Sequence, residues 1–276
     1  MLPRGVTRLS IATRLTRLAA LRAGQAERPD VLLVPGFTGS KEDFLPLLPL
    51  LADRGWSAWA IDLHGQFESG GPDEDESYSL SGWAADVVDI TAQTDGVHVV
   101  GHSFGGLVCR EAALTDATAM RSLTLLDSGP GALPQHHHHR LAMLTAAIPQ
   151  LSLEQIWQAK EQLDRAEGVQ PPAPEVQEFL HRRWVTGSPG ALRAIAQTLV
   201  TCPDQVDDLR VVAAAGLDCL VAYGIDDTTS WEIAEIIDMA RRLGTEAVAI
   251  PDAAHSPAVE NPEFTADLLD RFFRSG

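Results

Sequence analysis

The residues with the clearest chemical meaning form the motif G-H-S-F-G-G at 101–106. It follows an apolar run at 97–100 and opens a stretch with helical character. A G-x-S-x-G sequence between a strand and a helix places the serine on a tight, strained turn, where its hydroxyl stands above the edge of a sheet. Glycines on either side give the crowded turn room. Ser103 is therefore a candidate nucleophile.

A serine hydroxyl is a weak nucleophile until a base takes its proton. In a site built on such a turn, the chain order is serine, then acid, then histidine. Of the nine histidines, His255 is the natural base, because it follows the last apolar run and precedes the last predicted helix. Loops at strand ends commonly present catalytic side chains. His102, beside the candidate nucleophile, is expected to point away from the site and serve only in packing.

An acid that orients His255 is expected after the apolar run at 220–223. Asp226 and Asp227 both follow this run, and either could hold the imidazole in the required tautomer. Asp127 is a third candidate, because it follows another apolar run and so stands at a strand end. We favour Asp227 and keep the other two as alternatives.

A serine nucleophile also needs two backbone N–H donors for the negative charge that develops on the carbonyl oxygen. The N–H of Phe104, directly after the serine, is one candidate. The N–H of Phe37 is the other, in the glycine-rich loop P-G-F-T-G at 35–39.

The wider sequence alternates short apolar runs with longer helical stretches. Runs that are apolar throughout are typical of parallel strands covered on both faces. The predicted strands are 31–34, 56–63, 97–100, 122–126, 220–223 and 247–250. The predicted helices that follow them are 44–53, 80–94, 104–114, 230–243 and 257–273. This order predicts an α/β fold with a mostly parallel, doubly wound sheet, in which ligands bind at the carboxyl ends of the strands.

One long segment interrupts the alternation between Asp127 and Asp218. It is too long for a plain connection, and it contains helical stretches at 140–148, 153–167, 175–185 and 191–201. We predict a core at 1–130 and 216–276, with an inserted helical cap at 131–215 over the carboxyl edge of the sheet. Several apolar residues of the cap are candidates for lining an acyl pocket or for sealing the cap onto the sheet: Leu141, Leu144, Ile148, Ile156, Trp157, Phe179 and Trp184.

Charge and composition exclude several classes of function. The formal net charge of −17 disfavours nucleic-acid binding, because an acidic surface repels phosphate. No apolar stretch approaches the about 20 residues of a membrane span, and no secretory leader pattern is present. Three cysteines without a C-x-x-C pair indicate reduced thiols and a cytoplasmic setting.

We interpret three other features of the sequence as structural and not as functional. Residues 1–26 hold five arginines and no acid, which could imitate a transit peptide, but we prefer a surface strand pair. The run from His136 to His139 is interpreted as a solvated linker and not as a metal site, because consecutive histidines converge poorly on one ion. The acidic run at 73–76 is expected to be an exposed loop. No metal and no cofactor is expected.

Taken together, these motifs resemble the α/β-hydrolase superfamily, in its capped, esterase-like serine hydrolase branch. V-P-G-F at 34–37 resembles the H-G-F oxyanion loop of that branch, and D-L-H-G-Q-F-E-S at 62–69 resembles its D-x-x-G-x-G-x-S segment. G-I-D-D at 224–227 resembles its G-x-x-D acid loop, which favours Asp227, and A-H-S-P at 254–257 resembles its histidine loop. The likeness covers nearly the whole chain except the first 25 residues and the cap. Two departures are Pro35 in place of histidine and Phe67 in place of the second glycine.

The resemblance implies a serine hydrolase that cleaves a carboxylic ester of a small to medium, partly apolar molecule through an acyl-enzyme on Ser103. The same triad serves thioesterases, lactonases, peptidases, C–C bond hydrolases, perhydrolases and acyltransferases, so the substrate class stays open. The alternative from another functional class is a non-catalytic binding protein with the same fold. The expected partner is a small-molecule substrate.

Overall fold

The fold is built on one eight-stranded sheet, seen in a computed structural model that describes residues 2–71 and 78–275. The strands lie in the order β1-β2-β4-β3-β5-β6-β7-β8. The strands from β4 to β8 are parallel to one another, and β1 and β2 join this sheet as an antiparallel pair. Their bounds are β1 Thr7–Ala12, β2 Arg17–Ala23, β3 Val31–Val34, β4 Ala58–Ile61, β5 Val97–His102, β6 Met120–Leu126, β7 Asp218–Gly224 and β8 Ala247–Ile250.

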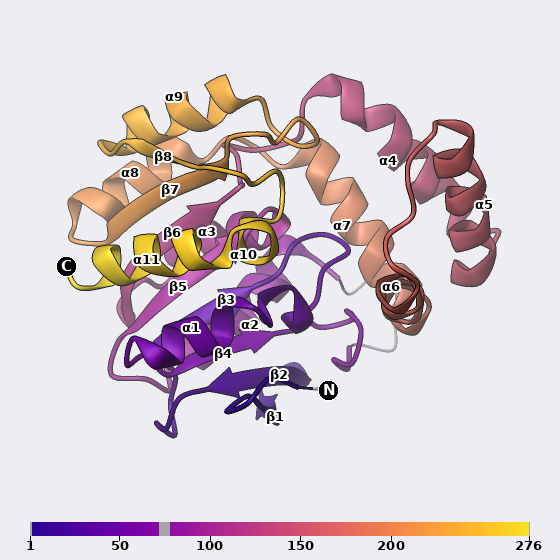
Figure 1. The fold of residues 1–276 in the computed structure, drawn as a ribbon. Helices are drawn as coiled ribbons and strands as arrows, with labels where there is room; N and C mark the ends of the chain where they lie inside the picture. Colours follow the sequence, from indigo (N-terminus) through magenta and orange to yellow (C-terminus); the bar gives the residue numbers. More distant parts are fainter. Residues whose placement is uncertain (1, 72–77, 276) are drawn as a thin grey trace.

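Helices cover both faces of this sheet, as the apolar character of its central strands requires (Figure 1). In β3, Leu33 packs toward α1 (Leu47–Asp53) and α11 (Pro262–Phe273), whereas Leu32 packs on the opposite face. The opposite face is covered by α2 Leu80–Thr91, α3 Phe104–Thr115, α8 Val206–Ala214 and α9 Ile233–Leu243. The predicted doubly wound α/β architecture is therefore confirmed.

The six predicted strands are all present, and the arginine-rich start forms the β1–β2 strand pair. Two predicted helices are interrupted. The first begins as the 3₁₀ turn η1 (Lys41–Phe44) before α1. The last divides at Asn261 into α10 (Pro257–Glu260) and α11, because Asn261 caps α11 through the N–H of Phe264 and leaves the helical backbone to do so.

The helical insert, residues 131–215, lies between β6 and β7 and contributes helices beside the carboxyl edge of the sheet (Figure 1). One helix of this range, α8, packs on the sheet. The remaining helices of the insert are α4 Gln135–Ala147, α5 Leu153–Ala166, α6 Pro174–Thr186 and α7 Pro189–Thr201. The histidine run lies in α4, so its interpretation as a linker was wrong. His137 Nε2 lies 2.9 Å from the Ser230 carbonyl oxygen, and His138 Nε2 lies 2.7 Å from that of Leu133.

No helix within residues 2–71 and 78–275 is both long and apolar enough to cross a membrane. The acidic run at 73–76 lies outside them, so its expected loop conformation stays a prediction.

Candidate active site

Ser103 lies between the end of β5 and the start of α3, in a backbone conformation that residues with a Cβ rarely adopt (φ 53°, ψ −121°). The two motif glycines are required by contact. An added Cβ would lie 2.4 Å from the Gly105 carbonyl oxygen if placed on Gly101, and 2.4 Å from the Val34 carbonyl oxygen if placed on Gly105. Strained backbone of this kind costs on the order of 1–3 kcal/mol and clusters at functional sites.

Replacing Gly105 with alanine is expected to lower the free energy of unfolding by about 1–3 kcal/mol, because the new methyl group meets rigid backbone of the β3 end. Urea denaturation followed by circular dichroism measures the change. Gly187→Ala is the matched control, since its nearest neighbour would lie at an ordinary 3.5 Å. Equal midpoints for the two variants would contradict the close approach of α3 to β3.

Three predicted residues from distant parts of the chain meet at the carboxyl edge of the sheet. His255 Nε2 lies 3.0 Å from Ser103 Oγ, and His255 Nδ1 lies 2.8 Å from Asp227 Oδ2. Asp227 also accepts hydrogen bonds from the Ser230 hydroxyl at 2.5 Å and from the Thr229 backbone N–H at 2.8 Å. The aspartate is thereby held with one carboxylate oxygen toward the imidazole.

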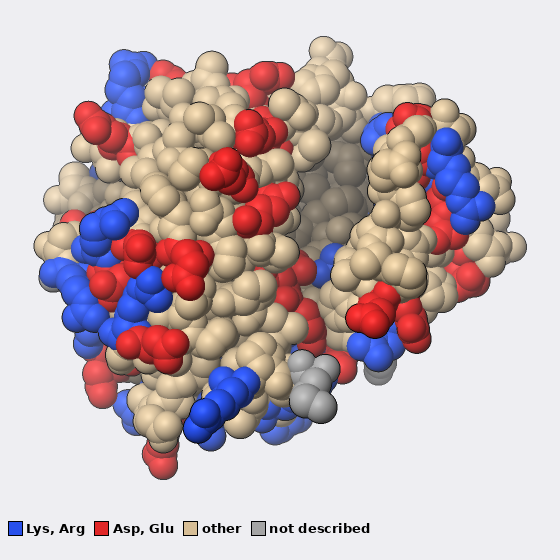
Figure 2. Space-filling model, in the orientation of Figure 1, with Lys and Arg blue, Asp and Glu red and all other residues tan. Residues whose placement is uncertain are grey.

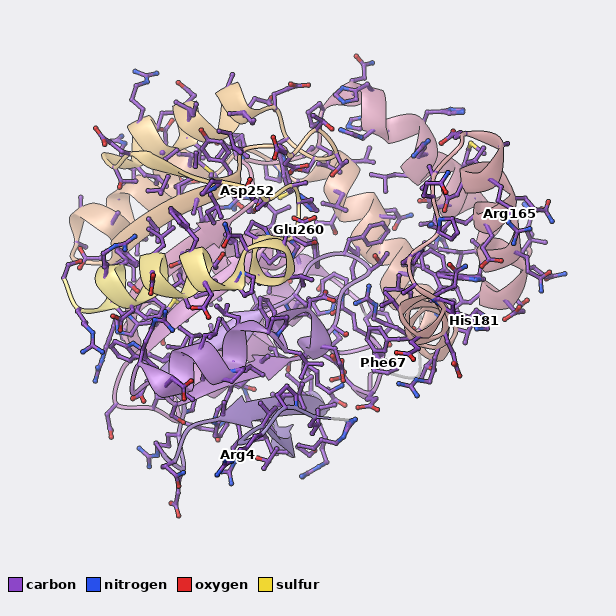
Figure 3. All side chains as sticks on the ribbon, in the orientation of Figure 1. Arg4, Phe67, Arg165, His181, Asp252 and Glu260 are labelled. Carbon is purple, nitrogen blue, oxygen red and sulfur yellow. The ribbon has the colours of Figure 1, made fainter. Side chains whose placement is uncertain are left out.

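The loop that carries His255 is fixed by two side chains that the sequence did not single out for this role. Glu260 of α10, labelled in Figure 3, accepts hydrogen bonds from the backbone N–H groups on both sides of His255, those of Ala254 (2.8 Å) and Ser256 (2.9 Å). His102 Nε2 lies 2.5 Å from the His255 carbonyl oxygen. His102 therefore bonds directly to the histidine loop, and the expectation that it serves only in packing was wrong.

The pKa values of Asp227 and His255 are set by their burial and by their attraction to each other. Burial disfavours ionisation of Asp227, but its bonds to His255, Ser230 and Thr229 outweigh this effect and hold its pKa well below the ordinary range. Burial likewise disfavours the imidazolium form of His255, but the hydrogen bond and charge of Asp227 raise its pKa above the usual 6.5. A charged form of His255, as a proton acceptor would become during a reaction, is thus stabilised by its neighbour.

Of the three candidate acids, only Asp227 bonds to His255 among the described residues. Asp226 is exposed, and its backbone N–H donates to the Ala253 carbonyl. Asp127 is buried with φ 45° at the end of β6, where one carboxyl oxygen accepts from the Gly224 N–H. Burial raises the pKa of Asp127 to about 7. One donor atom each from Asp127, Asp227 and His255 lies within 4.8 Å of the others.

The loop at 35–39 approaches the serine closely, since an added Cβ on Gly36 would lie 3.0 Å from Ser103 Cβ. Gln66, which is 6% exposed, holds this loop. Its amide nitrogen donates to the carbonyl oxygens of Gly36 (2.8 Å) and Phe37 (3.0 Å), while its amide oxygen accepts from the Leu63 N–H. Because the Gly36 carbonyl and the Phe37 N–H belong to one planar peptide group, the bond to Gln66 also sets the direction of that N–H.

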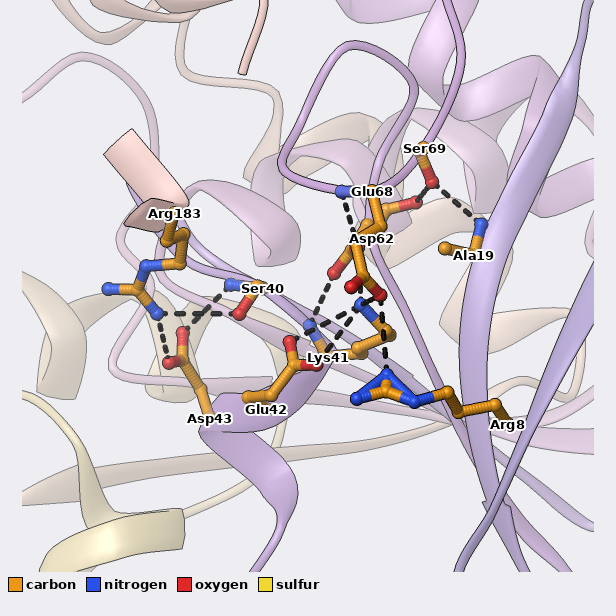
Figure 4. A network of polar contacts seen from close by, with 10 residues as sticks. All are labelled: Arg8, Ala19, Ser40, Lys41, Glu42, Asp43, Asp62, Glu68, Ser69 and Arg183. Carbon is orange, nitrogen blue, oxygen red and sulfur yellow. Dashed lines mark hydrogen bonds and ion pairs between the residues drawn. The ribbon is translucent and has the colours of Figure 1, made fainter. Parts of the chain in front are cut away.

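An ion-pair network around the buried Lys41 adjoins the segment that carries Gln66 (Figure 4). Lys41 of η1, 1% exposed, lies 2.8 Å from Asp62 Oδ2 and 2.8 Å from Glu68 Oε2. These two acids flank the segment that carries Gln66. The network thus joins η1 to the loop 62–69.

Phe67, the departure from the glycine pattern, has φ 37° and is buried. Its ring packs edge-to-face on Phe179 of α6, with centroids 5.9 Å apart, and Figure 3 shows it between the core and that helix. Lys41 Nζ lies 4.7 Å from the centroid of the same ring. An aromatic side chain at this position therefore joins the core to the insert, which a glycine could not do.

A cavity of 290 Å³ opens beside Ser103 and His255, and Figure 2 shows a deep hollow between the core and the insert. The 290 Å³ cavity is lined by both polar and apolar side chains. Polar side chains include Thr38, Asp43 and Ser230, and apolar ones include Leu133 and Leu199. None of the seven apolar insert residues named as pocket candidates lines this cavity. Trp184 lines an adjoining crevice of 40 Å³ that shares part of its lining with this cavity, including Arg183. Ile148 and Ile156 form the insert's own core with Leu153.

Comparison with known proteins decides the family. Residues 31–268 match the family model described as "Alpha/beta hydrolase family". The chain belongs to the α/β-hydrolase family. It is therefore an enzyme with hydrolase activity of the kind this family carries, and the resemblance inferred from the motifs is confirmed.

Individual relatives are distant. The chain is 33% identical over 138 residues to a putative carbamate hydrolase of Variovorax paradoxus, a match that covers 48% of this chain and only about half (51%) of that protein. It is 24% identical to a pimeloyl-[acyl-carrier protein] methyl ester esterase of Aeromonas hydrophila over 91% of this chain and 97% of the relative.

Solved structures agree on the fold. A thermophilic esterase from Thermogutta terrifontis superposes with a TM-score of 0.78 at 24% identity, covering 98% of both chains. An N-acyl homoserine lactonase superposes with a TM-score of 0.75 at 23% identity, also covering 98% of both chains. At these identities the similarity establishes the α/β-hydrolase fold.

Proposed function

We propose that this α/β-hydrolase is a serine esterase that cleaves a carboxylic ester of small to medium, partly apolar molecules. The observation that supports it most is the continuous contact from Ser103 Oγ through His255 to Asp227, with 3.0 Å and 2.8 Å between the bonded atoms. The full-length similarity to a methyl ester esterase agrees with this choice of substrate class. The mixed lining of the cavity suits an ester with both polar and apolar parts.

In the proposed reaction, Ser103 Oγ attacks the ester carbonyl carbon as its proton passes to His255 Nε2. The resulting oxyanion accepts hydrogen bonds from the N–H groups of Phe37 and Phe104. The tetrahedral intermediate then expels the alcohol, which takes the proton from His255, and an acyl-enzyme remains. Water attacks this ester with His255 again as the base, which releases the acid and restores the serine.

A substrate panel combined with covalent labelling tests this proposal. The protein is incubated with a fluorophosphonate, which forms an adduct with activated serines, and the labelled residue is identified by peptide mass spectrometry. Initial rates are measured on carboxylic esters, thioesters and lactones of equal acyl length. We expect an adduct on Ser103 and highest kcat/KM for the carboxylic esters. Labelling without ester turnover rejects the substrate class, and no adduct on Ser103 rejects the nucleophile.

Replacing Gln66 with leucine is expected to lower kcat by about 10- to 100-fold, somewhat less than the loss of an oxyanion donor itself. The reason is that the Gly36–Phe37 peptide group loses the bond that directs its N–H toward the oxyanion. KM should change by less than about threefold, because the donor is needed mainly in the transition state. Steady-state kinetics on one methyl ester measures both parameters.

Gln66→Glu separates this role from general packing. The glutamate keeps the size of the side chain and the acceptor for the Leu63 N–H, but in its ionised form it cannot donate to the two loop carbonyls. We expect it to lower kcat as much as the leucine variant does. Full activity in Gln66→Glu would show that donation from this side chain does not position the loop.

A further inference from the structure

The cavity beside Ser103 contains one arginine that the proposed mechanism does not use. Arg183 is the only lysine or arginine among the described residues that line this cavity. It comes from α6 of the insert, whereas the nucleophile and its partners come from the core. Its side chain is 12% exposed, so most of the side-chain surface is withdrawn from solvent.

Among the described residues, only one nitrogen of the Arg183 guanidinium has a hydrogen-bond partner. Nη1 bonds to Asp43 Oδ1 and lies 3.5 Å from Ser40 Oγ. Figure 4 shows Nη1 directed at these two residues, while Nε and Nη2 have no hydrogen-bond partner among the described residues. A guanidinium carries five N–H donors, so at least three make no hydrogen bond to the described residues.

The unused donors are held in a fixed orientation. The Arg183 guanidinium carbon lies 5.4 Å from the centroid of the Phe179 ring, on the same helix, and Asp43 holds Nη1 from the core side. An arginine held in this way presents a rigid, planar edge, which suits recognition of an acceptor oxygen. Donors that are partly buried gain most from a ligand that supplies that acceptor.

The charge of the surroundings decides which acceptor fits. Asp43 already neutralises Arg183, and it lines the same cavity. The protein as a whole carries a formal net charge of −17. A substrate carboxylate would therefore enter beside an acid in an acidic molecule, whereas a neutral carbonyl oxygen meets the free N–H edge without a repulsive neighbour.

We propose that the free edge of Arg183 binds a second, neutral carbonyl oxygen of the substrate, so that the enzyme prefers esters that carry another ester, amide or keto group. This inference rests on the proposed esterase function and narrows its substrate class. Arg183 is thereby a specificity-determining residue, and its pairing with Asp43 serves to orient the guanidinium as well as to join α6 to η1.

The test compares three esters of similar length: dimethyl succinate, methyl hexanoate and monomethyl succinate. The quantity measured is the ratio of kcat/KM for dimethyl succinate to that for methyl hexanoate. The intrinsic reactivity of each ester cancels when this ratio is compared between variants. We expect the ratio to fall by about tenfold in an Asp43→Asn/Arg183→Met double variant, as the loss of a charge-assisted hydrogen bond predicts. The double change leaves no buried charge unpaired.

Two further variants distinguish recognition from a merely structural ion pair. Arg183→Lys keeps the charge and the bond to Asp43 but lacks the second donor edge, so the ratio should fall here too. Arg182→Met is the matched control, because Arg182 neighbours Arg183 in α6 but does not line the cavity. An unchanged ratio in both Arg183 variants would overturn the proposal. A wild-type preference for monomethyl succinate that disappears with Arg183 would also overturn it, in favour of a carboxylate site.

Binding provides a readout that does not depend on turnover. Ligand-observed NMR compares dimethyl succinate with methyl hexanoate on the Ser103→Ala protein, with and without the Arg183→Lys change. Weaker binding of the diester in the lysine variant supports the recognition even if no ester is hydrolysed, and equal binding rejects it. Failure of the esterase proposal would show instead as absent turnover and absent labelling of the wild-type protein.

Discussion

Ser103→Ala is expected to lower kcat for ester hydrolysis by about 10⁴-fold or more, because the change removes the atom proposed to form the acyl-enzyme. A small rate above that in water should remain, since the oxyanion donors and the cavity are untouched. Product formation from a methyl ester, followed for long times at high protein concentration, measures this remaining activity.

The same variant should remain folded. It loses one hydrogen bond, from Ser103 Oγ to His255 Nε2, so the free energy of unfolding should change by no more than about 1 kcal/mol. Ser103→Gly provides a second inactive variant. It should be more stable than Ser103→Ala by about 1 kcal/mol, because φ 53° is strained for any residue with a Cβ. A folded Ser103→Ala protein with a tenth or more of the wild-type rate would remove Ser103 from the mechanism.

Asp227→Asn is expected to lower kcat by about 10⁴-fold, the effect of losing the carboxylate that fixes the histidine tautomer. The asparagine keeps the shape of the side chain, and its one amide oxygen can still accept from Thr229, which should hold the loop. Its amide nitrogen takes the place of Oδ2, the oxygen that accepts from Ser230 and faces His255. What it loses is the negative charge beside His255 Nδ1.

The pH dependence provides a separate signature of this loss. His255 must be neutral to accept a proton, so kcat/KM rises with pH through the pKa of His255. Because Asp227 raises that pKa, the wild-type inflection should lie above the ordinary value of 6.5. In Asp227→Asn the effect of burial is opposed only by the weaker attraction of Asp127 and Glu260, so the inflection should move to lower pH. A pH–rate profile between pH 5 and 9 on each protein measures the shift.

Asp226→Asn is the matched control, since Asp226 adjoins Asp227 but is exposed and, within the described residues, is bonded only through its backbone. Its kcat should stay within about twofold of wild type, as for most surface substitutions. Asp127→Asn tests the remaining alternative. If that variant lost far more activity than Asp227→Asn, the acid of the mechanism would be Asp127 and the proposed assignment would be wrong.

The features that could be predicted from the sequence are those that short-range physics encodes. Continuous apolar runs such as 31–34 identify strands buried on both faces, because only such strands lack an exposed side. The elbow at Ser103 could be identified because its glycines are required by contacts within the strand–turn–helix unit itself and with β3. The position of His255 followed from chain order and from the location of strand ends. The same reasoning left three candidate acids, and the resemblance of 224–227 to the acid loop of the family favoured Asp227.

Predictions about the helical insert were less successful, for a physical reason. Its apolar residues were candidates for lining an acyl pocket or for sealing the insert onto the sheet, and Leu141 does pack with the main core. Ile148 and Ile156 instead pack against each other, because an insert of several amphipathic helices must first bury its own apolar faces. The run from His136 to His139 is helical because its backbone can adopt the helical conformation and the side chains of His137 and His138 lie at hydrogen-bonding distance from carbonyl oxygens.

By itself, the sequence determined the family, the central sheet and the identities of the candidate serine, histidine and acid, since each is encoded by a local pattern. Only the tertiary structure brought Gln66 to the Gly36 carbonyl, Glu260 to both sides of His255, and Arg183 to the cavity beside Ser103. Such contacts join segments whose separation along the chain follows no fixed spacing. They arise from how helices and loops pack around the sheet edge, so no sequence motif predicts them.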